Sequence, residues 1–443
     1  MSRVSSPLKP RHFWVSARMS LASHLRVAMY REGYALVLSS AIGSLLGLLY
    51  WIVAARSYAA VIVGLNSAVI SAMMFVAGIS QLNLANAAVR FLPTAGVAST
   101  RFVTAIYLVT FGSCLVASTI FLAGAGIWTP TLKFLQDLPG PAIAFTISAM
   151  AWGAFNLQHS ILAGLRRAVW VPVENGAYSV GKLGLLALFA LILPQWGIFA
   201  SWTAALAMTI LPTAALIYGR LMPRHREVTG ADVAAPGLNN VAKYVGADYL
   251  GGLCWLASTS LVPIIVLQQA GPAANAYYSL SWVMVLPLYA IGASIGWSFV
   301  ASAVFEAGIL RTHGYRMLLQ TSMLVIPLTI ALIVGAPYIL RIFGEDYAEN
   351  GTSVLRLLAL AALPGTINTM YVNVARVQRR MSRVAMVFGG QALIVLGLTW
   401  LLLRPYGLTA VGVAWLVGQS AVAIVVATHA LVALRPQLPL RSK

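Results

Sequence analysis

The chain has 443 residues, of which 60% are hydrophobic and only 9% are charged. A soluble domain carries about 25% charged residues, so this composition excludes a water-soluble protein and indicates an all-helical membrane protein. The formal net charge of +19 would suggest nucleic acid in a soluble protein, but here the basic residues lie in short segments between apolar runs, as they do on the cytoplasmic side of a membrane. We therefore expect membrane lipids around the chain and no nucleic-acid partner.

The first 33 residues precede the first apolar run. Within them, residues 11–31 carry apolar side chains at helical spacing and arginines elsewhere, a pattern typical of a basic amphipathic helix in the headgroup layer. We therefore predict that residues 1–33 form a cytoplasmic N-terminal segment that contains such a helix.

Twelve apolar runs follow along the chain. Each is long enough to cross a bilayer core, which takes roughly 20 residues of helix. Backbone polar groups find no water in lipid, so helices are the structure expected for every run. The predicted spans cover residues 34–55, 62–89, 102–124, 141–165, 171–193, 197–219, 245–268, 276–304, 317–336, 353–375, 384–403 and 408–433.

A polar gap over residues 220–243 divides these spans into two groups of six. We predict an N-terminal six-helix bundle over 34–219, a cytoplasmic linker over 220–243, a C-terminal six-helix bundle over 244–433 and a cytoplasmic tail over 434–443. An even number of spans in each half gives both halves the same orientation, which is a parallel repeat about an axis along the membrane normal. The fold class expected is an all-α membrane protein with twelve transmembrane helices in two bundles.

The basic residues indicate the orientation of these helices. With the N-terminus inside, the cytoplasmic segments hold 23 Lys and Arg residues, and the outer loops hold four. Because positive charge is retained in the cytoplasm, this bias predicts a multi-pass protein of the cytoplasmic (inner) membrane with both termini cytoplasmic.

Motifs of membrane enzymes and pumps are absent from the sequence. It contains no G-x-x-x-x-G-K-[ST] segment, no H-E-x-x-H segment and no Cys/His cluster, so we expect no nucleotide-driven pumping within the chain, no metal site and no cofactor. A membrane glycan polymerase or ligase would need paired carboxylates and a sizeable outer loop, and the outer loops here are short. We expect no catalytic residues, and we keep this enzyme class as a less favoured alternative.

Lys182 lies in the middle of the span 171–193, about 11 residues or roughly 16 Å from either end. Its side chain cannot easily reach water from there, and a charge at the centre of a helix costs at least about 2.5 kcal/mol on insertion scales. Lys182 is therefore expected to face a hydrated cavity, an anionic ligand or an acidic partner. A paired lysine with a purely structural role is the alternative.

A second group of polar residues lies on and near the span 62–89. Asn83 and Asn86 are three residues apart, and Arg90 follows Asn86 by four, so one helix face carries all three. A guanidinium at the inner mouth suits two-pronged binding of phosphate, although topology alone also explains an arginine there. Asn66 and Gln158 are further candidates for lining water or sugar.

Few titratable groups lie near the membrane. Glu32 and Asp248 occupy matching places at the start of each half, so they either titrate and couple transport to an ion, H⁺ or Na⁺, or pair with neighbouring basic residues. Glu174 lies in the first turn of its helix, where a carboxylate suits the positive end of the helix dipole. For Glu174 and for the isolated His159 we expect structural roles.

One stretch resembles a known family: GLLYWIVAARSYAAVIVGLNSAVISAMMFVAGISQLNLANAAVRFLP, residues 47–93. A first helix that ends in an AR-x-Y turn, followed by VGLNSA and then by GISQLNL and RFLP, resembles polysaccharide (lipopolysaccharide O-antigen-like) flippases. These belong to the multidrug/oligosaccharidyl-lipid/polysaccharide exporter (MOP) superfamily. The specific match covers about 50 residues, and the second half matches in hydropathy alone.

The resemblance implies two bundles around a central V-shaped cavity and alternating access to it. It also implies a substrate made of an oligosaccharide on polyprenyl diphosphate, with glycan polymerase and glycosyltransferases as possible partners. Lys182 and Arg90 would then hold the diphosphate, while polar side chains meet the sugars. The alternative within the superfamily is a multidrug cation antiporter, against which a lysine instead of an acid at the middle of a helix argues.

Overall fold

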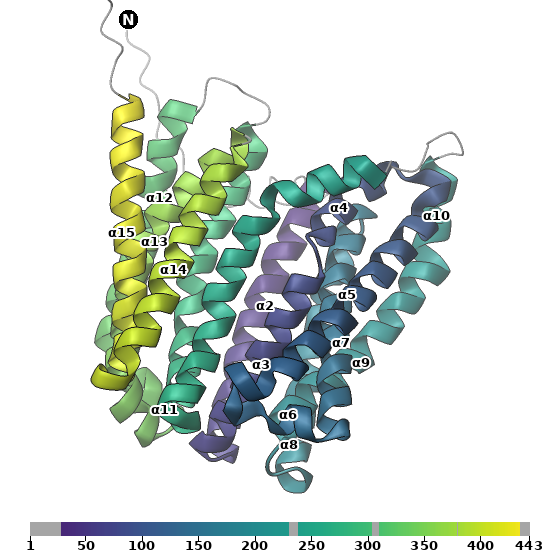
Figure 1. Cartoon of the computed structure of the whole chain (residues 1–443). Helices are drawn as coiled ribbons and strands as arrows, with labels where there is room; N and C mark the ends of the chain where they lie inside the picture. The colour runs from purple at the N-terminus through teal and green to yellow at the C-terminus, as the bar shows by residue number, and fades with distance from the viewer. Residues whose placement is uncertain (1–27, 230–237, 304–309, 379, 435–443) are drawn as a thin grey trace, which may run out of the picture.

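The structure, a computed structural model, describes residues 28–229, 238–303, 310–378 and 380–434, and this part of the chain is helical throughout (Figure 1). Its first half contains the helices α2 (Ala28–Ser57), α3 (Ala60–Ser80), α4 (Leu84–Phe91), α5 (Ser99–Trp128), α6 (Phe134–Asp137), α7 (Pro139–Gly164), α8 (Val171–Ile192), α9 (Gly197–Leu216) and α10 (Met222–Thr229). The second half contains α11 (Leu238–Ala303), α12 (Leu310–Arg341), α13 (Glu345–Val377), α14 (Met381–Tyr406) and α15 (Thr409–Leu434).

Apart from the span at 62–89, each predicted span lies in one of these helices or ends at most three residues beyond its bounds. Among the described residues, nine helices are long and apolar enough to cross a membrane, or ten if the bent pair α6–α7 is counted as one span. Helix α11 contains two of the predicted spans, because its backbone leaves the helical conformation at Gly271 (φ 87°, ψ 172°). A positive φ favours glycine, and Pro272 directly after it removes a backbone donor, so the sequence itself places the bend here.

The prediction of one continuous helix over 62–89 is wrong. Helix α3 ends at Ser80, and α4 begins at Leu84 after two residues in the left-handed region, Leu82 (φ 46°) and Asn83 (φ 58°). Asparagine visits this region more readily than most residues. Part of the expected linker 220–243 is also helical, since α9 continues through a π-helical turn into α10. The expected amphipathic helix over 11–31 lies almost entirely outside the described residues.

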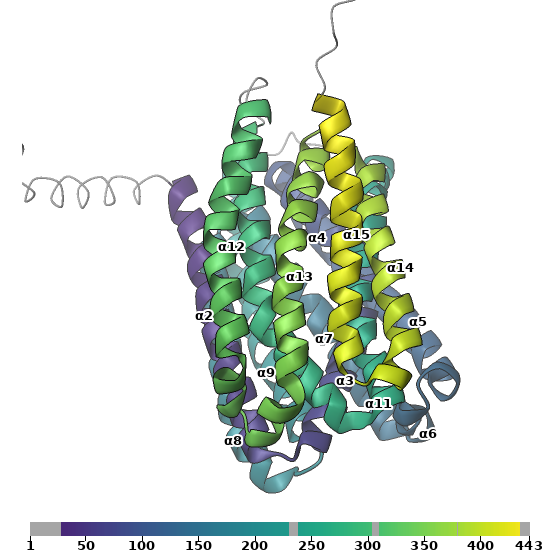
Figure 2. The ribbon, with the colours of Figure 1, turned by 90° about the vertical axis from the view of Figure 1, so that its left-hand side faces the viewer.

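The helices form two bundles that diverge toward one end (Figure 1). Helices α2–α9 make up one bundle, and α12–α15 together with most of α11 make up the other; Figure 2 shows α12–α15 side by side. The wide end carries α4 and α10, together with the basic residues Arg90, Arg224 and Arg226, whereas α6 lies toward the closed end. The two bundles are therefore open toward the basic side of the protein.

A polar seam between α3 and α11 joins the bundles at the closed end. The Asn275 side-chain amide donates to the Gly64 carbonyl (2.8 Å) and to the Ser67 hydroxyl (3.1 Å), and the Ser67 and Ser279 hydroxyls lie 3.2 Å apart. Gly64 has to be a glycine, because a Cβ there would lie 1.7 Å from the carbonyl oxygen of Pro272. The bend at 271–272 thus brings two backbones into direct contact.

A second contact crosses between the bundles near the same end. The Arg56 guanidinium, in the last turn of α2, donates to the carbonyls of Arg341 and Ile342, both at 2.8 Å. These carbonyls lie at the C-terminal end of α12, where the last four carbonyls of a helix lack partners within it. Arg56 therefore caps a helix of the opposite bundle.

Candidate functional site

Lys182 lies on the buried face of α8. The face consists of Val171, Glu174, Tyr178, Lys182 and Leu186, which recur at three- and four-residue spacing. Only 4% of Lys182 is exposed, although it occupies the middle of a membrane span. The helix therefore turns its basic residue into the N-terminal bundle and not toward lipid.

Three aromatic rings surround the Lys182 ammonium. Its Nζ atom lies 4.3 Å from the ring centroid of Trp202 on α9, 4.4 Å from that of Tyr50 on α2 and 4.9 Å from that of Tyr178 on α8. The Tyr50 hydroxyl donates to the Ile198 carbonyl and lies 2.9 Å from the Ser201 hydroxyl, which fixes that ring. We call Tyr50, Tyr178 and Trp202 the aromatic cage.

The cage accounts for the burial of the charge. A desolvated cation over an aromatic face gains about 2 kcal/mol, so three faces offset an insertion cost of about 2.5 kcal/mol without an acidic partner. No salt bridge and no hydrogen bond of Lys182 is found among the described residues. The three N–H donors of the ammonium thus remain available for water or an anion, because aromatic faces do not provide strong acceptors.

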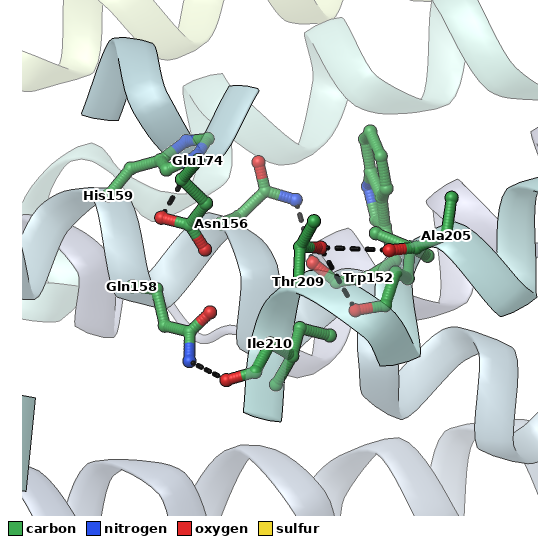
Figure 3. Close-up of polar contacts among 9 residues, drawn as sticks. Trp152, Asn156, Gln158, His159, Glu174, Ala205, Thr209 and Ile210 are labelled. Carbon is green, nitrogen blue, oxygen red and sulfur yellow. Dashed lines mark hydrogen bonds and ion pairs between the residues drawn. The ribbon is translucent and has the colours of Figure 1, made fainter. Parts of the chain in front are cut away.

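His159 and Glu174 lie side by side in the same bundle (Figure 3). The Nε2 atom of His159, on α7, is 3.7 Å from the Oε2 atom of Glu174, and the Glu174 side chain is 2% exposed. Neither carboxyl oxygen has a hydrogen-bond partner among the described residues. The two residues for which the sequence predicts structural roles therefore form one pair, in which Glu174 is buried and the His159 side chain is 23% exposed. Glu174 lies about 12 Å from Lys182 along α8.

Asn66 and Gln158 make hydrogen bonds inside the N-terminal bundle. The Asn66 amide donates to the carbonyls of Ile62 and Gln195 and accepts from the Phe199 N–H, so it ties α3 to the turn before α9. Gln158 donates to the Ile210 carbonyl at 2.9 Å (Figure 3). Both side chains are fully buried, and they hold helices together in this conformation.

Asn83, Asn86 and Arg90 lie together at the open end. Asn83 precedes α4, its side-chain oxygen accepts from the Asn86 amide at 2.6 Å, and Arg90 follows Asn86 by one turn on α4. Asn86 and Arg90 are exposed. The structure thus brings these three residues together on a short separate helix, and it does not bring them to Lys182, which lies in the middle of α8.

Glu32 and Asp248 lie in α2 and α11, but their side chains are outside the described ones. The expectation that they couple transport to an ion therefore stays a prediction. Within the described part of the chain, no group of three or more His, Cys, Asp and Glu residues could hold a metal ion.

An apolar groove runs along the seam of the two bundles, with a volume of about 540 Å³. It lies between α3 and α5 on one side and α11 and α14 on the other, and its lining includes Phe75, Phe121, Trp128, Leu261 and Trp400. Nearly all of the surface that lines this groove is apolar, so the groove suits a hydrocarbon chain.

The sequence predicts only part of the surroundings of Lys182. The spacing Glu174–Tyr178–Lys182 predicts a shared helix face, but Tyr50 and Trp202 come from distant helices that no local pattern connects to Lys182. His159 is likewise joined to Glu174 only by the packing of α7 on α8.

No family model matches the chain, and no curated protein matches it in sequence. Solved structures do share its fold. An inward-facing multidrug resistance MATE family transporter of the MOP superfamily has a TM-score of 0.67 at 13% identity, covering 90% of this chain and 97% of that one. An outward-facing MATE family transporter has a TM-score of 0.60 at 15% identity, covering 92% and 95%.

A third similar structure is a MOP superfamily transporter from Pyrococcus furiosus Vc1, with a TM-score of 0.61 at 13% identity, covering 92% of this chain and 95% of that one. It is described as having a binding pocket of reverse polarity that suggests a different function. The chain therefore has the MATE-like fold with its twelve transmembrane helices, and the predicted fold class is confirmed. The TM-score is higher against the inward-facing structure than against the outward-facing one.

Proposed function

We propose that this chain, which shares the fold of solved transporters, is itself a secondary transporter that works by alternating access. Its substrate, in this proposal, is a polyprenyl-diphosphate-linked oligosaccharide, which it moves across the cytoplasmic membrane for a surface polysaccharide such as lipopolysaccharide. The observation that carries the proposal is the buried Lys182 ammonium, whose three donors make no hydrogen bond to the described residues. An ammonium in this state attracts an anionic group and repels a cationic one.

Two further features support an anionic substrate with a lipid tail. Asn86 and Arg90 are exposed at the open end, where a guanidinium suits the first contact with a diphosphate. The apolar groove between α3 and α11 could hold the hydrocarbon tail of the substrate while its polar head crosses the membrane between the bundles. Glycosyltransferases would supply such a substrate from the inside, and a glycan polymerase would take it up outside.

A multidrug cation antiporter is the second candidate, because the similar solved structures include multidrug transporters. A cationic drug gains from aromatic rings and from acids near its charge. In this chain the aromatic cage is already occupied by the Lys182 ammonium, so an organic cation would meet like charge there. The reverse polarity described for the Pyrococcus furiosus transporter offers a parallel for such a change of substrate.

A flipping assay with purified protein separates the two candidates. Proteoliposomes would carry an undecaprenyl-diphosphate oligosaccharide, and a membrane-impermeant glycosidase would report the fraction of sugar that becomes accessible. We expect glycan accessibility to rise several-fold faster than in protein-free vesicles. We expect no accumulation of a lipophilic dye cation in the same vesicles under a pH gradient. Dye transport without glycan movement would favour the multidrug antiporter.

A further inference from the structure

The His159–Glu174 pair has no role in holding the substrate as proposed above. It lies between α7, α8 and α9, and Glu174 also lines a pocket of about 340 Å³ between α8 and α9. The Thr213 hydroxyl of α9 approaches the carboxyl, but both Glu174 oxygens and His159 Nε2 lack a hydrogen-bond partner among the described residues. A buried carboxyl this poorly satisfied is unusual in a folded protein.

An ionised carboxylate is not stable in this position by itself. Removing an ion from water is strongly unfavourable even after relaxation. The positive end of the α8 dipole offsets only a small part of that cost. The pair therefore holds one proton, either on the carboxyl or on the imidazole, where it forms an ion pair with Glu174. Its net charge is zero in both cases.

Other titratable groups near the His159–Glu174 pair come from the helices packed around it and from the turn before α8. The Tyr107 hydroxyl of α5 interacts electrostatically with Glu174, and the Tyr218 ring lies 6.5 Å from the Tyr107 ring. On α8, Tyr178 lies one turn after Glu174 and Lys182 lies two turns after it. The aromatic cage covers Lys182. Arg166 and Arg167 are exposed in the turn before α8. The α2 side chains over residues 28–42 are outside the described ones.

We propose that His159 and Glu174 form the proton-binding site that couples this transporter to a proton gradient. The inference rests on the proposed secondary transport. Release transfers the proton from Glu174 or His159 to water, and it leaves one uncompensated negative charge in a buried site. That charge destabilises the conformation seen here, which is open toward the basic end, relative to one in which the pocket between α8 and α9 is hydrated. One proton thus biases which end of the two bundles is open.

The proposal predicts a pH-dependent conformational equilibrium in protein without substrate. Spin labels on Arg224→Cys and Ser382→Cys, exposed residues at the inner ends of opposite bundles, report the inner opening by pulsed electron paramagnetic resonance in a background without Cys114 and Cys254. In the wild-type background we expect the long-distance population to fall as the pH rises from 5.5 to 8.5.

Two variants test the site. Glu174→Gln keeps the shape and stays neutral, so we expect the long distance at both pH values. His159→Asn removes the second proton acceptor, so we expect the midpoint pH of the change to move. Glu349→Gln, an exposed acid at the other end of the molecule, is the matched control and should respond like the wild type.

A wild-type protein whose distances do not change with pH would overturn the proposal, and so would a Glu174→Gln variant that responds like the wild type. The measurement needs no oligosaccharide. A pH response that depends on Glu174, combined with no flipping of the lipid-linked glycan, would therefore reject the proposed substrate alone.

Discussion

At the scale of single residues, Lys182 shows how a charge is kept inside a membrane helix without a counterion. The aromatic cage collects one ring from each of α2, α8 and α9, with centroids within 4.9 Å of Nζ. Such faces stabilise the positive charge but leave its N–H donors unused. The residue is thus stable in the resting protein and still able to bind an anion.

Substitutions of Lys182 test whether its charge serves transport. Lys182→Arg should retain at least part of the surface glycan in a deletion strain, because the charge remains, although a planar guanidinium changes the geometry. Lys182→Met and Lys182→Ala should reach normal membrane levels, because they remove a buried charge, yet lose most of the surface glycan. Lys182→Glu should lose all of it, since a carboxylate repels the diphosphate. Immunoblots of surface glycan and of membrane protein give both quantities.

The aromatic residue Trp152, which packs against Trp202, supplies a control for that series. Its ring centroid lies 5.6 Å from that of Trp202, outside the cage itself. Trp152→Phe should leave the surface glycan near the wild-type level. Full surface glycan with Lys182→Met at normal protein levels would reject a role for the charge in transport.

For Lys182, the sequence indicates the position in the span but not the residues that surround it. Its depth in the membrane follows from the length of the apolar run, and its burial follows from the cost of exposing a charge to lipid. The cage could not be predicted, because Tyr50 and Trp202 lie 132 and 20 residues away in the sequence. For Glu174 the sequence likewise indicates only the helix dipole, because His159 approaches it only through packing between helices.

At the scale of helices, the seam between α3 and α11 depends on the absence of a side chain at one position. The bend at Gly271 and Pro272 brings a carbonyl to within 1.7 Å of where a Gly64 Cβ would lie, so no side chain fits without a backbone shift. The hydrogen bonds of Asn275 to Gly64 and Ser67 depend on the same close approach.

Replacing Gly64 by alanine should therefore open the seam. We expect Gly64→Ala to destabilise the purified protein by about 1–3 kcal/mol, the usual cost of overpacking, and to lower its melting temperature in detergent. Gly47→Ala on α2 is the control, since a Cβ there meets no atom within 4 Å. Helix propensity alone makes that control neutral or slightly stabilising. Equal melting temperatures for the two variants would contradict the close contact at the seam.

The break between α3 and α4 marks the limit of prediction at this scale. Apolar runs identify spans because each must bury its backbone in lipid, and eleven of the twelve predicted spans lie in one helix or end at most three residues beyond its bounds. The break lies at Leu82 and Asn83, and leucine with a positive φ has no sequence signal. The sequence accordingly predicts the polar residues of α4 as part of a longer helix.

At the scale of the whole molecule, the direction of the opening and the distribution of charge agree. The bundles diverge at the end that carries Arg90, Arg224 and Arg226 (Figure 1). Because basic residues stay in the cytoplasm, this end is expected to be cytoplasmic and the conformation to be open inward.

Labelling from the two sides of the membrane tests this orientation. In a background without Cys114 and Cys254, Glu349→Cys should react with an impermeant maleimide added to intact spheroplasts, because this exposed residue lies at the start of α13 on the expected outer side. Arg224→Cys, exposed on α10, should react only after the membrane is permeabilised. Reaction of both from outside would contradict the twelve-span topology.

In the proposed transport cycle, the hydrogen bonds of Arg56 to the carbonyls of Arg341 and Ile342 set part of the energy that outward opening requires. Outward opening exchanges these two hydrogen bonds, and those of the seam, for hydrogen bonds to water, at a net cost of about 0.5–1.5 kcal/mol each. The five hydrogen bonds together amount to roughly 2.5–7.5 kcal/mol. One proton that crosses a potential of 100 mV releases about 2.3 kcal/mol. In the proposed proton-coupled cycle, the membrane potential acting on about one to three protons would therefore balance the loss of these hydrogen bonds.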